Sequence, residues 1–398
     1  MQDVQSIDRK CFLCGSSRQE IVEDFSGAAL FLENDFFKVD IKKVLCPDCG
    51  LIYASRYLNP EYLSKMYASF GMTPAELSDV PDFPARHDFF INSLNEIFSR
   101  TPKSILDIGC RKCETLDSFK KRGWKTYGVD ISPLSPQIGM ERGHHIWCGS
   151  FQDIDFGDLK FDAILLEVTL DHIPNPVYVL SRITSLLNNS GCLAVSVPES
   201  YTRLKNMDVS DILAEDHCNH FVPLTLQRFL KSEGLHLRDL YIDTEPPAPV
   251  IKVLAFKQPR EGGNVLDDLI GLNQLKEAID SYRQMKLKLN NVFSSLINKY
   301  KRVVVYCAGT YTTVVLPSFF GYNFKNCLAF VDNDVRKYGK TLFDRDVLPS
   351  SKLKVMKPDA VLISSKAFED EIYNNLKPEF PNIELICANR LLKEILCV

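Results

Sequence analysis

Four cysteines near the start of the chain have the spacing of a metal site. Cys11 and Cys14 form one CxxC pair followed by Gly15, and Cys46 and Cys49 form a second pair followed by another glycine. Each pair is a tight turn in which two thiolates converge, and two such turns supply the four sulfur ligands that suit tetrahedral Zn²⁺. Four thiolates leave no open coordination position, so we expect a structural zinc in a zinc ribbon. Unliganded thiols and a redox pair are the alternatives.

A glycine turn between two apolar strands predicts a nucleoside-binding site. Residues 104–109 form a short apolar run that contains Asp107 and ends in Gly109, and a helix and a second strand that closes on Asp130 follow. This order of strand, turn, helix, strand and acid begins a doubly wound α/β fold. The carboxylate at the end of the second strand accepts hydrogen bonds from ribose hydroxyls in such folds.

The composition of this turn selects between two nucleoside ligands. A dinucleotide site uses the full GxGxxG, because the pyrophosphate must approach the helix N-terminus closely. Here Gly109 is the only glycine of the turn, and the residues from Cys110 to Cys113 fill the rest. S-adenosylmethionine carries no phosphate, and the spelling DxG followed by Asp130 resembles motif I of class I methyltransferases. We interpret Cys110 and Cys113 as packing residues of the loop.

Later segments continue the same pattern. Residues 146–151 resemble the strand and loop that hold adenine, and residues 161–167 form a buried strand that ends at the carboxyl edge of the sheet, where ligands bind. The candidate cofactor-binding residues are Asp107, Gly109, Asp130, Ile131, Ser150, Phe151 and Glu167.

Three of the seven histidines fall where the acceptor would meet the cofactor. His172 follows the strand that ends at Glu167, and His217 and His220 lie in one short segment. Histidine is the natural general base near neutral pH, and a carboxylate next to it can orient the ring. Asp216 precedes His217, so we expect this pair to act together. A capping or packing role is the alternative for each histidine, and His220 could also belong to a metal site.

Composition limits the class of protein that these sites belong to. The chain has 398 residues, which at roughly 150 residues per domain predicts two or three domains. A net charge of -4 argues against a dedicated nucleic-acid binder, and no apolar run reaches the length of a membrane span. The first residues do not resemble a signal peptide, and 13 cysteines, an odd number, do not suggest a disulfide framework. We therefore expect a cytoplasmic protein without membrane or nucleic-acid partners.

The last third of the chain reads as a separate α/β unit. Residues 259–263 form a linker rich in glycine, and an apolar stripe from Leu275 to Tyr300 predicts an amphipathic helix that packs on a core. A strand, a turn at Gly309, a second strand and Asp332 then repeat the pattern of the middle of the chain. A nucleotide site and a structural domain are both compatible with this lone glycine.

The whole order resembles a known family. CxxCG, CPxCG, the DxG turn, the segment around His217 and a terminal glycine-turn domain follow one another as in the three-domain sugar C-methyltransferases of deoxysugar biosynthesis, such as the mycarose and tetronitrose 3-C-methyltransferases. Two departures stand out: Arg111-Lys112-Cys113 replaces Asn-Asp-Gly, and Ala214 replaces a tyrosine that helps to hold the sugar.

The resemblance implies a fold, a reaction and a set of roles. The fold is a zinc-binding domain over 1–75, an S-adenosylmethionine domain over 76–258 and a Rossmann-like domain over 259–398. The substrate is a nucleotide-linked 4-keto-deoxysugar. The family's catalytic Glu-His pair corresponds to Asp216 and His217, and its further active-site histidine corresponds to His172.

A sugar carbon becomes nucleophilic only as an enolate. We therefore expect His217 to remove the proton next to the ketone, Asp216 to orient it, and His172 to steady the enolate oxygen.

Two other functions are also compatible with these residues. O-methylation of a sugar or another small molecule needs only a base and a hydroxyl, so the same histidine would serve. The altered turn at Arg111–Cys113 is compatible with a protein that has kept the fold and lost catalysis. A zinc-ribbon protein that acts on nucleic acid is disfavoured by the charge. We expect a monomer or a small homo-oligomer.

Overall fold

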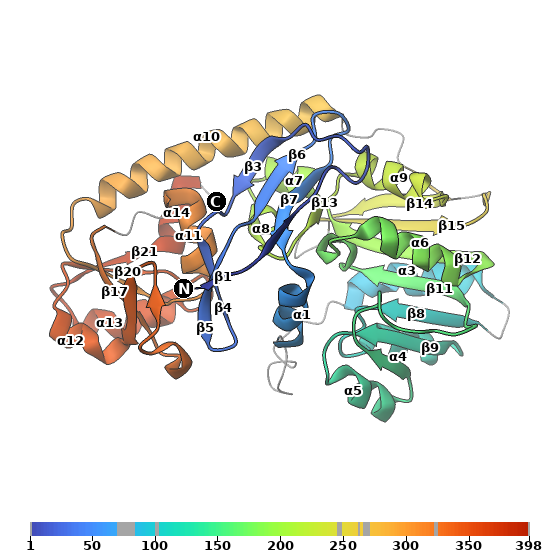
Figure 1. Ribbon diagram of the computed structural model, residues 1–398, viewed down its shortest axis with the longest axis horizontal. Helices are drawn as coiled ribbons and strands as arrows, with labels where there is room; N and C mark the ends of the chain where they lie inside the picture. The colour runs from blue at the N-terminus through green and yellow to red at the C-terminus, as the bar shows by residue number, and fades with distance from the viewer. Residues whose placement is uncertain are drawn as a thin grey trace.

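The computed structural model contains three units that follow one another along the chain (Figure 1). It describes residues 2–69, 84–99, 103–244, 249–261, 263–265, 271–321 and 325–396. An N-terminal β unit, blue in Figure 1, lies between a middle α/β unit, green, and a C-terminal α/β unit, orange. Within the described ranges, no helix has both the length and the apolar character needed to cross a membrane.

The N-terminal unit is built from two small sheets. One sheet has the order β13-β7-β6-β3, with β2 paired to β7, and the other has the order β1-β5-β4. Residues 35–39 and 42–45 follow each other closely but enter different sheets, and the carboxylate of Asp40 between them accepts a hydrogen bond from Arg56 at 2.7 Å. The elements are β1 (Gln2–Asp3), β2 (Ser6–Asp8), β3 (Glu20–Asp24), β4 (Ala28–Leu32), β5 (Asp35–Val39), β6 (Lys42–Leu45), β7 (Ile52–Leu58) and α1 (Pro60–Ser69).

The middle unit has the seven-stranded sheet of class I methyltransferases. Its order is β10-β9-β8-β11-β12-β15-β14; the first five strands are parallel, and β15 runs antiparallel to both neighbours. The doubly wound fold expected from the glycine turn is therefore confirmed. The elements are α3 (Pro84–Ile97), β8 (Ser104–Ile108), α4 (Glu114–Lys120), β9 (Lys125–Asp130), α5 (Ser135–Arg142), β10 (His145–Cys148), β11 (Phe161–Glu167), η1 (Leu170–His172), α6 (Pro176–Leu186), β12 (Leu187–Pro198), α7 (Ser200–Lys205), α8 (Ser210–Leu213), β13 (Asn219–His220), α9 (Pro223–Ser232), β14 (His236–Asp243) and β15 (Val250–Phe256).

The C-terminal unit is a second Rossmann-like domain. Its sheet has the order β18-β19-β17-β16-β20-β21, and only the short β18 is antiparallel to its neighbour. The elements are α10 (Leu272–Ile297), β16 (Val303–Tyr306), η2 (Tyr311–Val315), α11 (Leu316–Phe320), β17 (Cys327–Asp332), η3 (Val335–Lys337), β18 (Thr341–Leu342), β19 (Arg345–Pro349), η4 (Ser350–Lys352), α12 (Leu353–Met356), β20 (Ala360–Ile363), α13 (Glu369–Glu379), β21 (Glu384–Cys387) and α14 (Ala388–Leu396).

Helix α10 ties the C-terminal unit to the N-terminal one. It runs along the top of the molecule from the C-terminal sheet to β3 (Figure 1). Its apolar stripe lies in one continuous core with both units, and Tyr282 and Lys286 donate hydrogen bonds to the buried carboxylate of Glu23. The stripe thus packs on a core, as expected. The expected domain boundary after residue 75 lies outside the described residues, and the boundary after 258 stays a prediction.

Candidate active site

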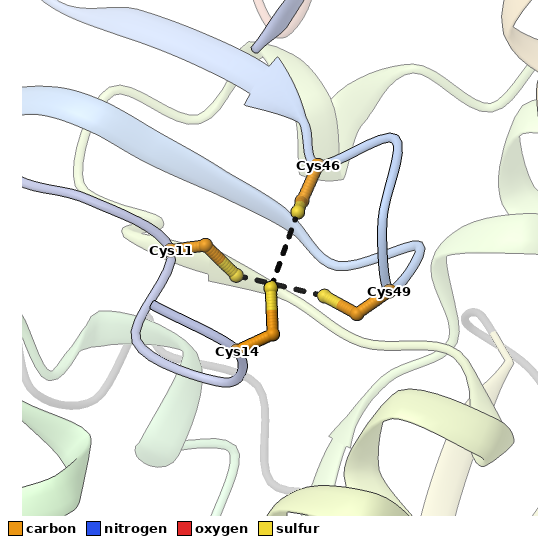
Figure 2. A group of neighbouring side chains, drawn as sticks. All are labelled: Cys11, Cys14, Cys46 and Cys49. Carbon is orange, nitrogen blue, oxygen red and sulfur yellow. Dashed lines mark hydrogen bonds between the residues drawn. The ribbon is translucent and has the colours of Figure 1, made fainter. Parts of the chain in front are cut away.

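The four N-terminal cysteines converge on one point (Figure 2). The sulfurs of Cys11 and Cys49 are 3.5 Å apart, as are those of Cys14 and Cys46. Zn–S bonds of about 2.3 Å place tetrahedral sulfurs about 3.8 Å apart, so the cluster fits Zn²⁺. The turns that carry the sulfurs close on backbone hydrogen bonds from each glycine, and Gly15 has a φ of 74°. A zinc held here would be structural and would leave no position for substrate.

The predicted cofactor residues gather at one edge of the middle sheet. Asp107 lies near the end of β8 and Gly109 directly follows that strand. Asp130 ends β9 and Glu167 ends β11, and the three strands are neighbours. The Asp130 carboxylate accepts hydrogen bonds from the backbone N–H groups of Arg111 and Ser132, both at 2.8 Å. Each carboxylate oxygen keeps a second lone pair, so this edge fits a ribose.

Two residues of the turn at Arg111–Cys113 have the left-handed backbone conformation that glycine favours. Arg111 and Cys113 adopt left-handed φ values of 41° and 65°. Cys113 stands where the sugar C-methyltransferase pattern that the sequence resembles has glycine, and it is fully buried beside Cys110. This agrees with the packing role expected for both thiols. The substitution therefore changes the side chains of the turn and preserves its left-handed conformation.

The residues expected to surround adenine differ in their exposure. Ile131 is half-buried at the sheet edge, and Ser150 lies beyond the carboxyl end of β10. Phe151, by contrast, is buried, with its ring against Phe156 and beneath the guanidinium of Arg182. A role of Phe151 in holding adenine stays a prediction.

His217 is oriented by a different carboxylate from the one expected. Its Nδ1 lies 2.7 Å from Oδ1 of Asp211 in helix α8. The neighbouring Asp216 instead approaches Nδ1 of His172, at 3.1 Å. The predicted pairing of Asp216 with His217 is therefore wrong, because side chains that follow one another in this turn point in different directions. Asp211 also accepts from Ser200 at 2.9 Å, which fixes its carboxylate.

His172 is surrounded by the carboxylates of Asp171 and Asp216. Tyr67 of α1 places its hydroxyl 3.0 Å from Nδ1 of His172 and 3.3 Å from Asp216. Burial alone would lower the pKa of His172, but the charges of Asp171 and Asp216 outweigh it and raise the pKa to about 9. His172 is consequently an imidazolium at neutral pH. Its positive charge in turn lowers the pKa of Asp216, despite the burial of that carboxyl.

Asp171 lies between the two reactive rings. Its Oδ2 is 3.5 Å from Nε2 of His172 and 3.6 Å from Nε2 of His217. Its side chain is 1% exposed and, among the described residues, neither oxygen has a hydrogen-bond partner. A buried carboxylate at this distance stabilises positive charge on either ring.

His220 lies behind the cluster. It is 2% exposed, and its Nδ1 is 3.0 Å from Asp211. Burial lowers the pKa of His220 to about 4, so the ring is neutral. It therefore supports Asp211 from the protein interior, on a strand that pairs with β7 of the N-terminal sheet.

Sequence analysis did not identify Asp211, Asp171 or Tyr67 as site residues. Asp211 stands six positions before His217, and Tyr67 comes from a helix of the N-terminal unit. Asp171 was the easiest of the three to predict, since an Asp-His pair at the end of a buried strand is a local signal. The contact of Tyr67 depends on how distant segments pack, and that of Asp211 on how the chain folds back after α8.

The site segment touches the cofactor turn. Thr169, three residues before His172, donates a hydrogen bond to the carbonyl of Ile108 at 3.3 Å. A Cβ atom at Gly109 would lie 2.8 Å from the Thr169 hydroxyl, which explains why glycine is required here. The segment that carries His172 therefore packs directly against the glycine turn.

Comparison with known proteins agrees with this geometry. Residues 85–240 match the methyltransferase domain family, and residues 247–382 match the C-methyltransferase C-terminal domain. The chain is an S-adenosylmethionine-dependent methyltransferase. The match at residues 247–382 also supports transfer to carbon.

The relatives of this methyltransferase are distant. The ubiquinone biosynthesis O-methyltransferase of Aeromonas salmonicida (strain A449) is 25% identical over 175 residues, 39% of this chain and 71% of that protein. That of Dechloromonas aromatica (strain RCB) is 25% identical over 138 residues, 30% of this chain and 58% of that protein.

Solved structures are also similar to part of the chain. The 1,6-didemethyltoxoflavin-N1-methyltransferase of Burkholderia thailandensis has a TM-score of 0.42 and 20% identity over 52% of this chain and 94% of its own. The magnesium protoporphyrin IX methyltransferase of Synechocystis PCC 6803 has a TM-score of 0.42 and 13% identity over 50% of this chain and 100% of its own.

Proposed function

We propose that this methyltransferase transfers a methyl group from S-adenosylmethionine to the carbon next to the ketone of a nucleotide-linked 4-keto-deoxysugar, and that His217 removes the proton from that carbon. The observation that carries the proposal is the pairing of His217 with Asp211 beside the charged His172, at the edge where the cofactor residues gather. A base next to a fixed cation is what enolate formation requires.

His217 has the arrangement of a general base. Its Nδ1–H donates to Asp211, which leaves the lone pair of Nε2 to take a proton. After the transfer, the imidazolium would lie between the carboxylates of Asp211 and Asp171. General-base catalysis of this kind contributes roughly 10²–10⁴-fold.

His172 supplies the complementary charge. Its Nε2–H is the donor that would meet the oxygen on which negative charge develops, because its Nδ1 is engaged by Tyr67 and Asp216. Fixed donors aimed at developing charge are usually the largest single contribution to such catalysis. When bound, S-adenosylmethionine supplies an electrophilic methyl group; the side chains described here handle the proton and the enolate charge.

A cavity that extends from Glu215 to Gly309 supports the proposal of a nucleotide-linked substrate. It encloses about 240 Å³ and is bounded by the β4–β5 hairpin, by Glu215 one residue before Asp216, and by the C-terminal unit at Gly309, Thr310 and Lys337. A nucleotide-linked sugar in this cavity would place its sugar near Glu215 and its nucleotide near the glycine turn of the C-terminal unit. Nucleotides commonly bind at such turns.

O-methylation is the second candidate, because the curated relatives named above are O-methyltransferases. His217 could equally take a proton from a hydroxyl group. The His172 imidazolium favours the enolate route. Removal of a proton next to the ketone places negative charge on the ketone oxygen, which this cation would stabilise. Removal of a hydroxyl proton leaves the charge on the attacking oxygen, so no second oxygen becomes charged.

The test uses His217→Asn in the full chain, with His236→Asn as the matched control on the exposed strand β14. We expect the His217 variant to lose about 100-fold or more in turnover of a nucleotide-linked 4-keto-6-deoxysugar. Binding of S-adenosylhomocysteine, measured by calorimetry, should not change in either variant. Unchanged turnover in His217→Asn would remove this residue from the mechanism.

A further inference from the structure

A lysine of the N-terminal sheet β13-β7-β6-β3 contacts the segment between Asp211 and His217. Lys43 lies on β6, three residues before Cys46, and its side chain is fully buried. Its ammonium donates hydrogen bonds to the carbonyls of Ile212 at 2.8 Å and Ala214 at 2.5 Å. The ring of Phe25 lies 5.6 Å away on the other side. A buried lysine is rare unless it is paired.

The two carbonyls that Lys43 binds mark the end of helix α8. Helix ends leave carbonyls without partners inside the helix, and a cation there is favourable. Asp211 lies immediately before the first of these residues and Glu215 immediately after the second. Asp211 orients His217, so a small shift of this segment would move the base.

The charge of Lys43 is also directed at the site. Burial lowers the pKa of Lys43 to about 8, and the charges of Asp211, Asp216, Cys218 and Glu215 oppose that decrease. The same ammonium contributes to the lowered pKa of His220. Lys43 therefore faces the acidic groups that surround the catalytic histidines.

We propose that Lys43 is a positioning residue for the reaction: it holds the segment between Asp211 and His217 in place and couples the zinc-ribbon sheet to the geometry of the base. The zinc ribbon then has a defined role in catalysis, although its four thiolates do not touch substrate. The consequence for turnover rests on the proposed function of His217, whereas the contacts of Lys43 do not.

The experiment compares Lys43→Met, Lys43→Arg and Lys42→Met in the full, zinc-loaded chain. Lys42 is the matched control: it is the preceding residue on β6, and its ammonium lies 3.6 Å from Asp24, away from the site. For Lys43→Met we expect kcat to fall about 100-fold, the size of loss that a misplacement of about 1 Å causes. KM for the sugar and the affinity for S-adenosylhomocysteine should not change.

Lys43→Arg keeps a charge and donors, so it should restore part of kcat, and Lys42→Met should behave as wild type. Unchanged kcat in Lys43→Met would overturn the proposal. A parallel loss of kcat, cofactor affinity and melting temperature would also overturn it, because it would show a purely structural role. If Lys43→Met does not fold, Lys43→Gln takes its place, and an unchanged kcat in a folded Lys43→Gln variant would overturn the proposal.

A second readout does not need the sugar. Histidine titration followed by NMR should show the pKa of His220 rising from about 4 in Lys43→Met and staying unchanged in Lys42→Met. No rise would contradict the coupling. A wild-type chain that shows this behaviour but methylates no keto sugar would refute the proposed function and leave the placement of Lys43 intact.

Discussion

His217 and its carboxylate show that neighbours in sequence need not be partners in space. Asp216 is adjacent to His217, yet Asp211 binds it, because α8 and the turn after it fold the segment back on itself. Asp211 is also shared with His220 and Ser200, so a single carboxylate organises both histidines of the segment. The proposed base is thus held by a network rather than by one contact.

Replacing Asp211 should therefore damage the reaction more than the cofactor site. In Asp211→Asn the amide can no longer stabilise the imidazolium that forms on His217, so we expect kcat to fall about 100-fold. Steady-state kinetics with the keto sugar measure this loss, and binding of S-adenosylhomocysteine is the control. A variant with normal kcat would show that Asp211 does not act through His217.

The charge of His172 predicts how activity depends on pH. Its pKa is raised to about 9, so the imidazolium is present below that value and is lost as the pH rises through it. We expect kcat/KM to decline above about pH 9 for this reason. Asp216→Asn removes one of the carboxylates that raise the pKa, so the decline should begin at lower pH. A basic limb that stays in place in Asp216→Asn would contradict this assignment.

Some of these residues could be predicted from local spacing and some could not. The cysteine turns and the Asp107–Gly109 turn are short motifs whose geometry is set by a few neighbouring residues, and the structure brings each together. Tyr67 and Lys43 contact residues more than 100 positions away in the chain, and Asp211 meets His217 only because the chain folds back after α8, so no local pattern encodes these contacts. The packing of Arg182 over Phe151 likewise could not be predicted from local spacing.

The cluster of four cysteines in the N-terminal unit predicts a structural metal. We expect one Zn²⁺ per chain by elemental analysis, and a lower metal content and melting temperature in Cys46→Ser, because the folding of such units depends on the bound metal. Cys148→Ser is the control, since Cys148 is exposed and lies outside the cluster. Full metal content in Cys46→Ser would contradict the four-thiolate site.

Helix α10 offers a test of how the units are joined. Glu23 is 1% exposed and accepts hydrogen bonds from Tyr282 and Lys286 of this helix. Tyr282→Phe removes one hydrogen bond to a buried charge, so we expect unfolding in urea to become easier by about 2 kcal/mol. Tyr178→Phe, at an exposed position on α6, is the control. Equal stability of the two variants would show that this contact does not hold the helix.

The cavity beside Gly309 is lined by residues from all three units. A Cβ atom at Gly309 would meet no atom within 4 Å, so a side chain there would project into open space beside the cavity. We expect Gly309→Val to raise KM for the nucleotide-linked sugar roughly tenfold, with a smaller rise for Gly309→Ala. Affinity for S-adenosylhomocysteine is the internal control. An unchanged KM would place the nucleotide elsewhere.

The order of the three units could be predicted because each carries its own local pattern. The cavity could not be predicted in this way, since its walls come from the β4–β5 hairpin, from Glu215 and from the turn at Gly309, which lie far apart in the chain. Likewise, β13 leaves the middle unit to join the N-terminal sheet, a pairing of two residues that carries no sequence signal.

The most direct test of the account is the bond formed to the transferred methyl group. The purified chain would be incubated with S-adenosylmethionine labelled with carbon-13 in its methyl group and a panel of nucleotide-linked 4-keto-6-deoxysugars, and the products read by NMR and mass spectrometry. The account predicts a methyl group bonded to the sugar carbon next to the ketone. A methyl group on oxygen, or no product from a chain that binds S-adenosylhomocysteine, would contradict it.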